Sequence, residues 1–342
     1  MHSVICTVIL VLALVAGVVV SAVIGQLDVG PREVLGALLD RLGIDTGWRP
    51  DDLIADAVWF IRMPRVVMSL LVGLCLAIAG VMMQAIFGNP LAEPGVVGVS
   101  SGAALGAAIA IAAGWERFGG GWAIAASAFV VGLLATAFVY STARREGRTE
   151  VVTLLLTGIA VNAFAGAGLA FVLFAGDTGS REQIVFWQLG TINGTRWIEV
   201  LPVAVVGMLG SIFALWVGRK YDVLSLGERS ALHLGIRVER LRIASMAVIA
   251  LLTGVAVAFT GIIAFVGLVI PHVMRMVIGP SHRGLILGSA LAGAVLLVWS
   301  DVLARTLVEG ADLPIGLMTS LVGGPFFLYL VRQSRSRSGG WA

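Results

Sequence analysis

The sequence predicts an all-α membrane protein with about ten transmembrane helices, and three observations support this fold class. Of its 342 residues, 58% are hydrophobic and only 13% are charged, and the mean hydropathy is +1.00. That is more apolar surface than one soluble core can bury. Apolar runs of roughly 20 residues recur along the whole chain, and a helix needs about 20 residues to cross the hydrocarbon core of a bilayer. No stretch has the composition of a soluble domain, so residues 1–342 are predicted to form a single transmembrane domain.

Ten spans are predicted in chain order. They cover residues 4–25, 66–87, 96–113, 122–142, 151–174, 198–217, 243–263, 264–278, 285–303 and 315–331. The first span has no Arg or Lys before it and no convincing cleavage pattern of small residues, so it is predicted to be a retained helix rather than a signal peptide. An even number of spans returns the C-terminus to the side on which the chain begins.

The positive charges predict which side that is. If the N-terminus is cytoplasmic, 14 of the 23 Lys and Arg residues fall in inside segments, and they concentrate in short loops, where the positive-inside rule applies best. Both termini are therefore expected in the cytoplasm. The cations are scattered between spans and form no basic face, so nucleic acid is not an expected partner. Cys6 and Cys75 both lie in apolar runs, which indicates neither a disulfide framework nor a cysteine metal site.

Glycine clusters predict how the helices pack. Many of the 44 glycines occur with Ala and Ser, as in VGLCLAIAG and GSALAGAV, and such small residues let helix backbones approach closely inside a bilayer. The segments 72–80 and 253–261 share their glycine spacing and belong to spans of opposite direction. This weak echo is the arrangement expected of an inverted repeat.

A polar segment separates the second apolar run from the third. In QAIFGNPLAEPGVVGVSSGAALGA, Pro90 and Pro94 are predicted to end one helix and begin the next, while Asn89 and Glu93 supply polar groups for the freed backbone of a cytoplasmic turn. A generic tight turn has the same composition.

Three separated blocks carry a resemblance to a known family. They are RMPRVVMSLLVGLCLAIAGVMMQAIFGNPLAEPGVVGVSSGA, GIIAFVGLVIPHVMRMVIGPSHR and SDVLARTLVEGADLPIGLMTSLVGGPFFLYLV. In this order they resemble the FecCD family, the permease subunits of ABC importers for iron-siderophores, haem and vitamin B12. The likeness extends over nearly the whole chain and implies the type II ABC importer permease fold.

The resemblance also implies partners, location and cargo. The partners are a second permease subunit, identical or paralogous, two ATP-binding cassette ATPase subunits, and an extracytoplasmic substrate-binding protein. The expected location is the plasma membrane of a bacterial cell, which is the inner membrane in a cell that also has an outer membrane. The expected cargo is an iron(III)-siderophore, the commonest assignment in the family, with haem or cobalamin as alternatives, and no cofactor is expected.

A subunit of this kind needs a separate motor. A phosphate-binding loop ends in Gly-Lys-Ser/Thr, yet Lys220 in VGRKYD is the only lysine in the sequence, so the chain is not expected to be an enzyme. The longest cytoplasmic connection, residues 222–242, is predicted to contain a short helix over residues 225–235, bounded by glycines. It resembles the family's coupling helices, which bind a cleft of the ATPase; a solvated loop is the alternative. The residues assigned to coupling are Leu226, Gly227, Glu228, Ala231, Leu234 and Gly235.

Three arginines are predicted near the outer ends of spans. Arg62 and Arg65 precede the second span, and Arg305 follows the ninth. In the family, arginines at matching positions receive glutamates from the two lobes of the binding protein, which implies a docking role. Simple anchoring of helix ends at the interface is the alternative, since a central arginine costs about 2.5 to 3.5 kcal/mol on insertion scales.

The translocation path is the hardest feature to predict. Thr157 and Asn162 on the fifth span are candidates for a polar stripe, because that span lines the path in relatives; helix–helix hydrogen bonding explains them equally well. His272 has no partners at ligand spacing, so no metal site is expected. A secondary transporter or channel is the alternative class, but the spans hold few carboxylates to relay protons. No motif of an intramembrane enzyme is present.

Overall fold

The computed structural model describes residues 2–25, 29–44, 46–48, 50–145, 148–308 and 310–337. Almost all of them are helical. The helices are α1 (His2–Val23), α2 (Pro31–Arg41), α3 (Asp52–Asp56), a π-helical turn η1 (Ala57–Arg62), α4 (Met63–Phe87), a 3-10 turn η2 (Pro94–Val97), α5 (Val99–Ala112), α6 (Glu116–Gly119), α7 (Gly121–Thr142), α8 (Val151–Ala175), α9 (Thr178–Leu189), α10 (Trp197–Leu224), α11 (Glu228–His233), α12 (Val238–Thr260), α13 (Val266–Ile278), α14 (His282–Thr306) and α15 (Ile315–Arg337). Two short antiparallel strands, β1 (Arg144–Arg145) and β2 (Arg148–Thr149), join α7 to α8.

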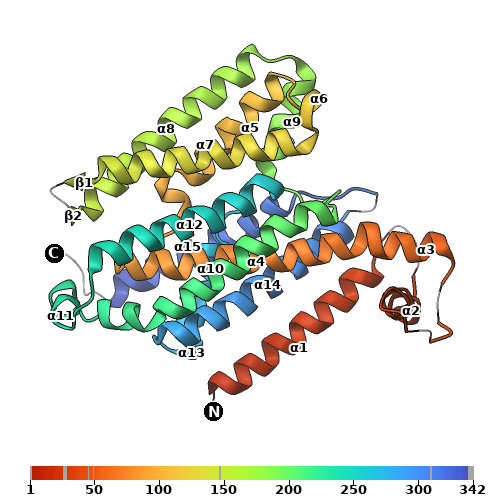
Figure 1. Cartoon of the computed structure of the whole chain (residues 1–342), viewed down its shortest axis with the longest axis horizontal. Helices are drawn as coiled ribbons and strands as arrows, with labels where there is room; N and C mark the ends of the chain where they lie inside the picture. The colour runs from red at the N-terminus through yellow and green to blue at the C-terminus, as the bar shows by residue number, and fades with distance from the viewer. Residues whose placement is uncertain are drawn as a thin grey trace.

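The long helices run roughly along one axis (Figure 1). The start of α1, the end of α15, the β1–β2 hairpin and α11 lie towards one end of this axis, here called the inner end. The helices α2, α3 and α6 lie towards the opposite, outer end. Among the described residues, seven helices are long and apolar enough to cross a membrane, and α5, α13 and Ile315–Tyr329 of α15 are shorter apolar helices. Each of the ten predicted spans overlaps one of these ten elements, although some ends differ by several residues: α10 continues to Leu224, where the predicted span ends at residue 217.

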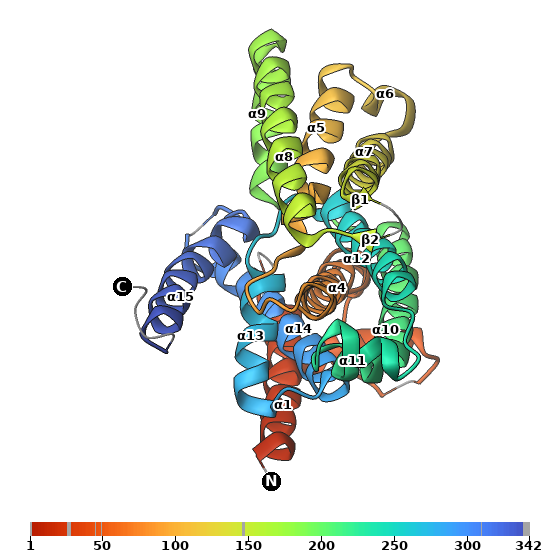
Figure 2. The ribbon, with the colours of Figure 1, turned by 90° about the vertical axis from the view of Figure 1, so that its left-hand side faces the viewer.

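Helix α4 occupies the centre of the larger helix group, with α10, α12, α13 and α14 around it (Figure 2). Small residues make this packing possible. A Cβ atom added to Gly73 of α4 would lie 2.2 Å from the carbonyl oxygen of Gly293 on α14, and one added to Gly80 would lie 1.9 Å from that of Gly267 on α13. The glycine clusters thus do what the sequence predicts: they allow backbones to touch.

The order of helix lengths repeats along the chain. Helices α4, α5, α7 and α8 have 25, 14, 22 and 25 residues, and α12, α13, α14 and α15 have 23, 13, 25 and 23. In each series a break in the α-helix precedes the short second helix: residues 88–98, which include η2, before α5, and residues 261–265 before α13. Helix α4 runs from the outer to the inner end and α12 in the opposite direction (Figure 1). This is the inverted repeat predicted from the glycine spacing.

The boundaries differ from the prediction at the break before α13. Spans predicted to meet at residues 263 and 264 are separated by a non-helical segment, residues 261–265. Gly261 and Phe265 both have positive φ, 70° and 68°, which ends one helix and starts the next. The shorter helices α2, α3, α6 and α9 were not predicted, because their composition is more polar than that of the spans.

Candidate functional site

The connection between α10 and α12 is the first candidate site. Its helix α11 is shorter than the predicted segment, Glu228–His233 instead of residues 225–235. Gly227 and Gly235 flank it with φ of 107° and 79°. Residues with a Cβ atom rarely adopt these conformations, so the two glycines permit the sharp turns at both ends of α11. The whole element lies at the inner end of the molecule (Figure 1).

Helix α11 has one buried side and one exposed apolar side. Ala231 is fully buried, whereas Leu226, Leu232 and Leu234 are 70%, 57% and 66% exposed. These three leucines lie on or beside a short helix that projects from the bundle, beyond the apolar part of α10. Exposed leucines gathered at such a place are typical of an interaction surface. The ATPase coupling predicted for this segment stays a prediction.

An ion pair connects α11 to α12. The carboxylate of Glu228 accepts a hydrogen bond from the guanidinium of Arg242. Both residues of this pair line a cavity of about 390 Å³, together with Gln84 and Arg275, among others. Arg275 of α13 donates to the Gln84 side chain of α4 over 3.1 Å, and Gln84 donates to the Leu268 carbonyl oxygen over 3.2 Å. Polar contacts that connect α11 to α12, and α13 to the central helix α4, therefore line one cavity.

The predicted inner turn, Asn89, Pro90, Glu93 and Pro94, packs against the second half of the chain. Gly88 ends α4 with a φ of 60°, Asn89 accepts a hydrogen bond from the Leu91 N–H over 2.9 Å, and Pro94 begins η2. Glu93 accepts a hydrogen bond from the Phe265 N–H over 3.2 Å, at the break that precedes α13. Burial raises the pKa of the Glu93 carboxyl, and this hydrogen bond partly opposes the rise. The turn is therefore more than a solvated connection: it joins the two repeats.

Two of the three predicted docking arginines, Arg65 and Arg305, meet at Asp301. Arg65 Nε lies 2.9 Å from Asp301 Oδ1, Arg65 Nη1 lies 2.9 Å from Asp312 Oδ2, and Arg305 Nη2 lies 3.1 Å from Asp301 Oδ2. The side chain of Asp301 is 2% exposed, and those of Arg65 and Arg305 are 11% and 9% exposed. Arg62, Arg65, Arg305, Asp301 and Asp312 are called the outer arginine cluster below.

Arg62 and Arg305 also hold the end of α1. Arg62 donates to the carbonyl oxygens of Ala22 and Val23, the first over 2.7 Å. Arg305 donates to the carbonyl oxygen of Ile24 over 2.9 Å and to the hydroxyl of Ser21 over 2.6 Å. The last carbonyl groups of a helix lack the N–H donors that its interior supplies, so the two guanidiniums act as a C-terminal cap of α1. These contacts lie within the protein and test neither interface anchoring nor docking, and both stay predictions.

The predicted path residues lie on α8, much of whose surface is exposed in the single chain. Asn162 accepts a hydrogen bond from the Ser101 hydroxyl of α5 over 2.6 Å, which is the helix–helix contact offered as the alternative explanation. Thr157 is partly exposed. In the described part of the chain, no group of three or more His, Cys, Asp or Glu side chains is placed to hold a metal ion.

Several residues of these sites were not predicted. Gln84 and Arg242 were assigned no role, although a glutamine within an apolar run is itself a signal of a buried polar contact. No role was predicted for Asp301 either. Asp312 follows a Gly-Ala pair in a short loop, and nothing local indicates that it pairs with Arg65.

Comparisons with known proteins agree with this architecture. The model of the FecCD transport family matches residues 12–333. The hemin transport system permease protein HmuU of Yersinia pestis is 40% identical over 291 residues, which cover 83% of this chain and 87% of that protein. The cobalamin import system permease protein BtuC of Halobacterium salinarum is 41% identical over 278 residues, or 81% of this chain and 74% of that one.

A solved structure has the same fold over nearly its whole length. An inward-facing conformation of a metal-chelate type ABC transporter aligns with a TM-score of 0.82 and 30% identity, covering 95% of this chain and 97% of the solved chain. The family match extends over the coupling connection, the inner turn and the outer arginine cluster alike. The chain belongs to the FecCD transport family, with the permease fold that its sequence predicts.

Proposed function

We propose that this chain is the membrane-spanning permease subunit of an ATP-driven importer that moves a metal chelate into the cell. It works as a dimer with an identical or paralogous permease, together with two ATPase subunits and a substrate-binding protein. It lies in the plasma membrane with its inner end, and therefore both termini, in the cytoplasm. The observation that carries the proposal is α11, whose three exposed leucines at the inner end have the character of a protein interface.

The mechanism is alternating access driven through α11. When the ATPase moves α11, the Glu228–Arg242 pair transfers the displacement to α12. The cavity that this pair lines leaves space in which the Arg275–Gln84 contact of the central helices can rearrange. Because packed helix interfaces switch between discrete arrangements, a small shift at the inner end is enough to reshape the path between two permease subunits.

The proposed cargo class is a metal chelate: an iron(III)-siderophore, haem or cobalamin. The siderophore is the prediction from the sequence, whereas the relatives are named for hemin and cobalamin. Equilibrium binding of the three ligand types to the cognate binding protein, measured by tryptophan fluorescence, decides among them. Tight binding of haem or cobalamin with no siderophore binding contradicts the siderophore assignment.

The proposed binding-protein site is the outer arginine cluster, which holds three guanidiniums and two aspartates. Docking requires a glutamate of the binding protein to replace Asp312 on Arg65, since Asp312 is the more exposed of the two aspartates. Asp312→Asn is therefore expected to strengthen binding of the cognate binding protein to permease in nanodiscs. High salt is expected to weaken the wild-type complex by screening charges beyond about 8 to 10 Å. If neither the Asp312→Asn substitution nor high salt changes binding, the docking site lies elsewhere.

The function itself is tested by uptake into sealed proteoliposomes that contain the permease, its ATPase and the loaded binding protein. The proposal requires uptake to stop when the ATPase subunit or ATP is left out. Ala231→Pro, which breaks the buried side of α11 at a cost of about 3 kcal/mol or more, is expected to insert normally and to abolish uptake. Uptake that persists without the ATPase supports a secondary transporter instead.

A further inference from the structure

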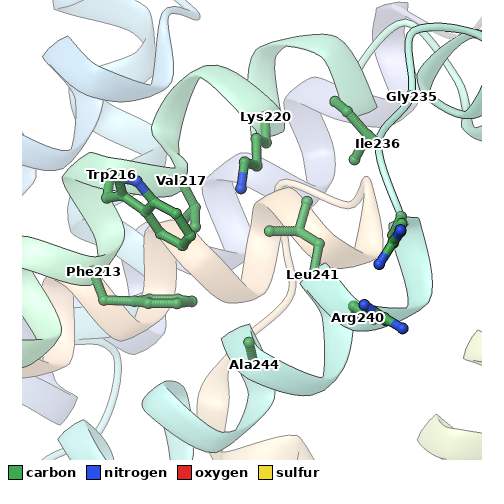
Figure 3. Close-up of a pocket in the computed structure, with 10 residues that line it drawn as sticks. Phe213, Trp216, Val217, Lys220, Gly235, Ile236, Arg240, Leu241 and Ala244 are labelled. Carbon is green, nitrogen blue, oxygen red and sulfur yellow. The ribbon is translucent and has the colours of Figure 1, made fainter.

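A groove at the inner end of α10 and the start of α12 has no part in the function proposed so far (Figure 3). Its volume is about 390 Å³. Phe213 and Trp216 of α10 and Leu241 of α12 form apolar walls, and Lys220, Arg237 and Arg240 add three cations. These six residues are called the basic groove. In Figure 3 the Lys220 side chain lies above Leu241, between the two helices.

The three cations lack acidic partners. No carboxylate lines the groove, and in the described part of the chain none forms an ion pair with Lys220, Arg237 or Arg240. The neighbouring Glu239 is bound to Tyr140 and Thr149 instead. The Lys220 ammonium lies 4.0 Å from the centroid of the Trp216 ring, a cation–π contact that fixes it over the apolar wall. The groove therefore offers unneutralised positive charge beside apolar surface.

The groove continues the exposed apolar side of α10. Exposed large side chains recur on this helix at intervals of three or four residues, and Trp216, 64% exposed, is the last of them: Leu201, Val205, Met208, Ile212 and Trp216. Lys220 stands one turn further on. In Figure 2, α10 lies on the side of the molecule away from α15, so this surface faces outwards. A tryptophan followed by a lysine at the end of such a stripe is typical of the boundary between hydrocarbon and headgroups.

We propose that the basic groove binds an anionic phospholipid of the cytoplasmic leaflet. Lys220, Arg237 and Arg240 bind the headgroup phosphate, and an acyl chain lies along Phe213, Trp216 and Leu241. Basic pockets between helices on the cytoplasmic side are suited to such headgroups. The orientation of the groove rests on the topology proposed above. The combination of apolar walls with cations favours a lipid over an acidic surface of the ATPase, which would need no groove for an acyl chain.

Occupancy of the groove has a consequence for coupling. Gly235 and Ile236, the residues that lead from α11 to α12, also line it. A lipid that bridges Lys220 on α10 and Arg240 on α12 therefore fixes the two helices between which α11 is held. We expect anionic lipid to raise ATP-driven uptake through this contact, in addition to binding there.

The test measures binding of phosphatidylglycerol to the purified permease in detergent by native mass spectrometry, with phosphatidylcholine of the same acyl chains as the neutral probe. Each surface cation contributes about 1 kcal/mol to binding of an anionic lipid, or about fivefold in affinity. Lys220→Ala and Arg240→Gln are each expected to lose about fivefold for phosphatidylglycerol, and Lys220→Arg to retain binding. Arg117→Ala, an exposed arginine on α6 at the outer end, is the matched control and is expected to change nothing.

Two further arms exclude other occupants. Excess inorganic phosphate is expected not to displace the lipid; displacement at millimolar phosphate, or equal binding of both lipids, overturns the proposal. In proteoliposomes, Arg240→Gln is expected to lose the stimulation of uptake by phosphatidylglycerol while still binding the ATPase. Loss of ATPase binding with lipid binding unchanged assigns the groove to the ATPase instead. Arg240 is exposed and forms no ion pair in the described part of the chain, so Arg240→Gln is expected to fold. This variant therefore tests lipid binding even if Lys220→Ala does not fold.

Discussion

Replacing Asp301 with Asn removes the one buried carboxylate of the outer arginine cluster while keeping the size of the side chain. Asp301 is 2% exposed and lies 2.9 Å from Arg65 and 3.1 Å from Arg305. The substitution leaves two guanidiniums that are about nine-tenths buried without their shared counter-charge. Breaking a buried ion pair by removing one partner costs about 3–5 kcal/mol.

The remaining contacts of the two arginines set the expected value within that range. Arg65 keeps its pair with Asp312, and Arg305 keeps its hydrogen bonds to the carbonyl oxygen of Ile24 and the hydroxyl of Ser21. Neither guanidinium is left without a polar partner, so we expect a loss near the lower end, about 3 kcal/mol.

Asp312→Asn is the matched control. It removes the same group from the same arginine, but Asp312 is 34% exposed, and exposed pairs contribute only about 0 to 1 kcal/mol. The assay is the unfolding midpoint of both purified variants in one detergent, followed by helical circular dichroism. The reasoning is refuted if Asp301→Asn unfolds no earlier than Asp312→Asn, because burial then does not determine the strength of the pair.

Three further predictions concern packing, the path and the inner turn. Gly80→Ala is expected to lower the unfolding midpoint by the equivalent of about 1–3 kcal/mol or more, because the added Cβ atom meets a backbone carbonyl oxygen. Gly121→Ala, which has open space around it, is the control and is expected to leave the midpoint unchanged. Equal midpoints of the two variants contradict the close packing of the helices. Asn162→Ala removes the hydrogen bond from Ser101 and is expected to cost only about 0.6 kcal/mol of stability. If Asn162 lines the path, the substitution lowers uptake far more than it lowers stability. Unchanged uptake indicates that Asn162 serves only as a helix–helix contact. Burial raises the pKa of Glu93, so the folded state binds the proton of this carboxyl group more tightly than the unfolded state does. The stability of the wild-type protein is therefore expected to fall as the pH rises from the ordinary glutamate pKa through the raised one. Glu93→Gln is expected to lose this dependence when the unfolding midpoint is measured between about pH 4 and 8. If the midpoints of the variant and the wild type change with pH in parallel, Glu93 is not the responsible group.

The helices could be predicted because their signals are local. A span is an apolar run of sufficient length, and each of the ten predicted runs overlaps a helix. The same holds for α11, whose flanking Gly227 and Gly235 are visible in the sequence. The break at residues 261–265 was missed because the run there stays apolar. Its backbone is satisfied by distant groups, such as the Glu93 carboxyl, which hydropathy does not report.

The sites could be predicted only as residues, and their partners could not. Arg65 was recognised as a cation near a helix end, yet its burial depends on Asp301, 236 positions further along the chain. Asn162 was recognised as polar within an apolar run, yet its hydrogen-bond partner Ser101 lies 61 positions away. Such contacts are set by which helices become neighbours, and a single sequence does not state that.

Binding of the cognate ATPase to the exposed side of α11 tests the central claim most directly. Leu232→Asp places a charge on that side without touching the buried Ala231, and Leu42→Asp, at the opposite end of the molecule, changes a comparably exposed leucine as the control. The measurement is the affinity of purified ATPase for permease in nanodiscs, together with ATP-driven uptake by each variant. The account predicts that Leu232→Asp loses ATPase binding and uptake while Leu42→Asp retains both. Wild-type affinity and uptake in the Leu232→Asp variant would contradict it.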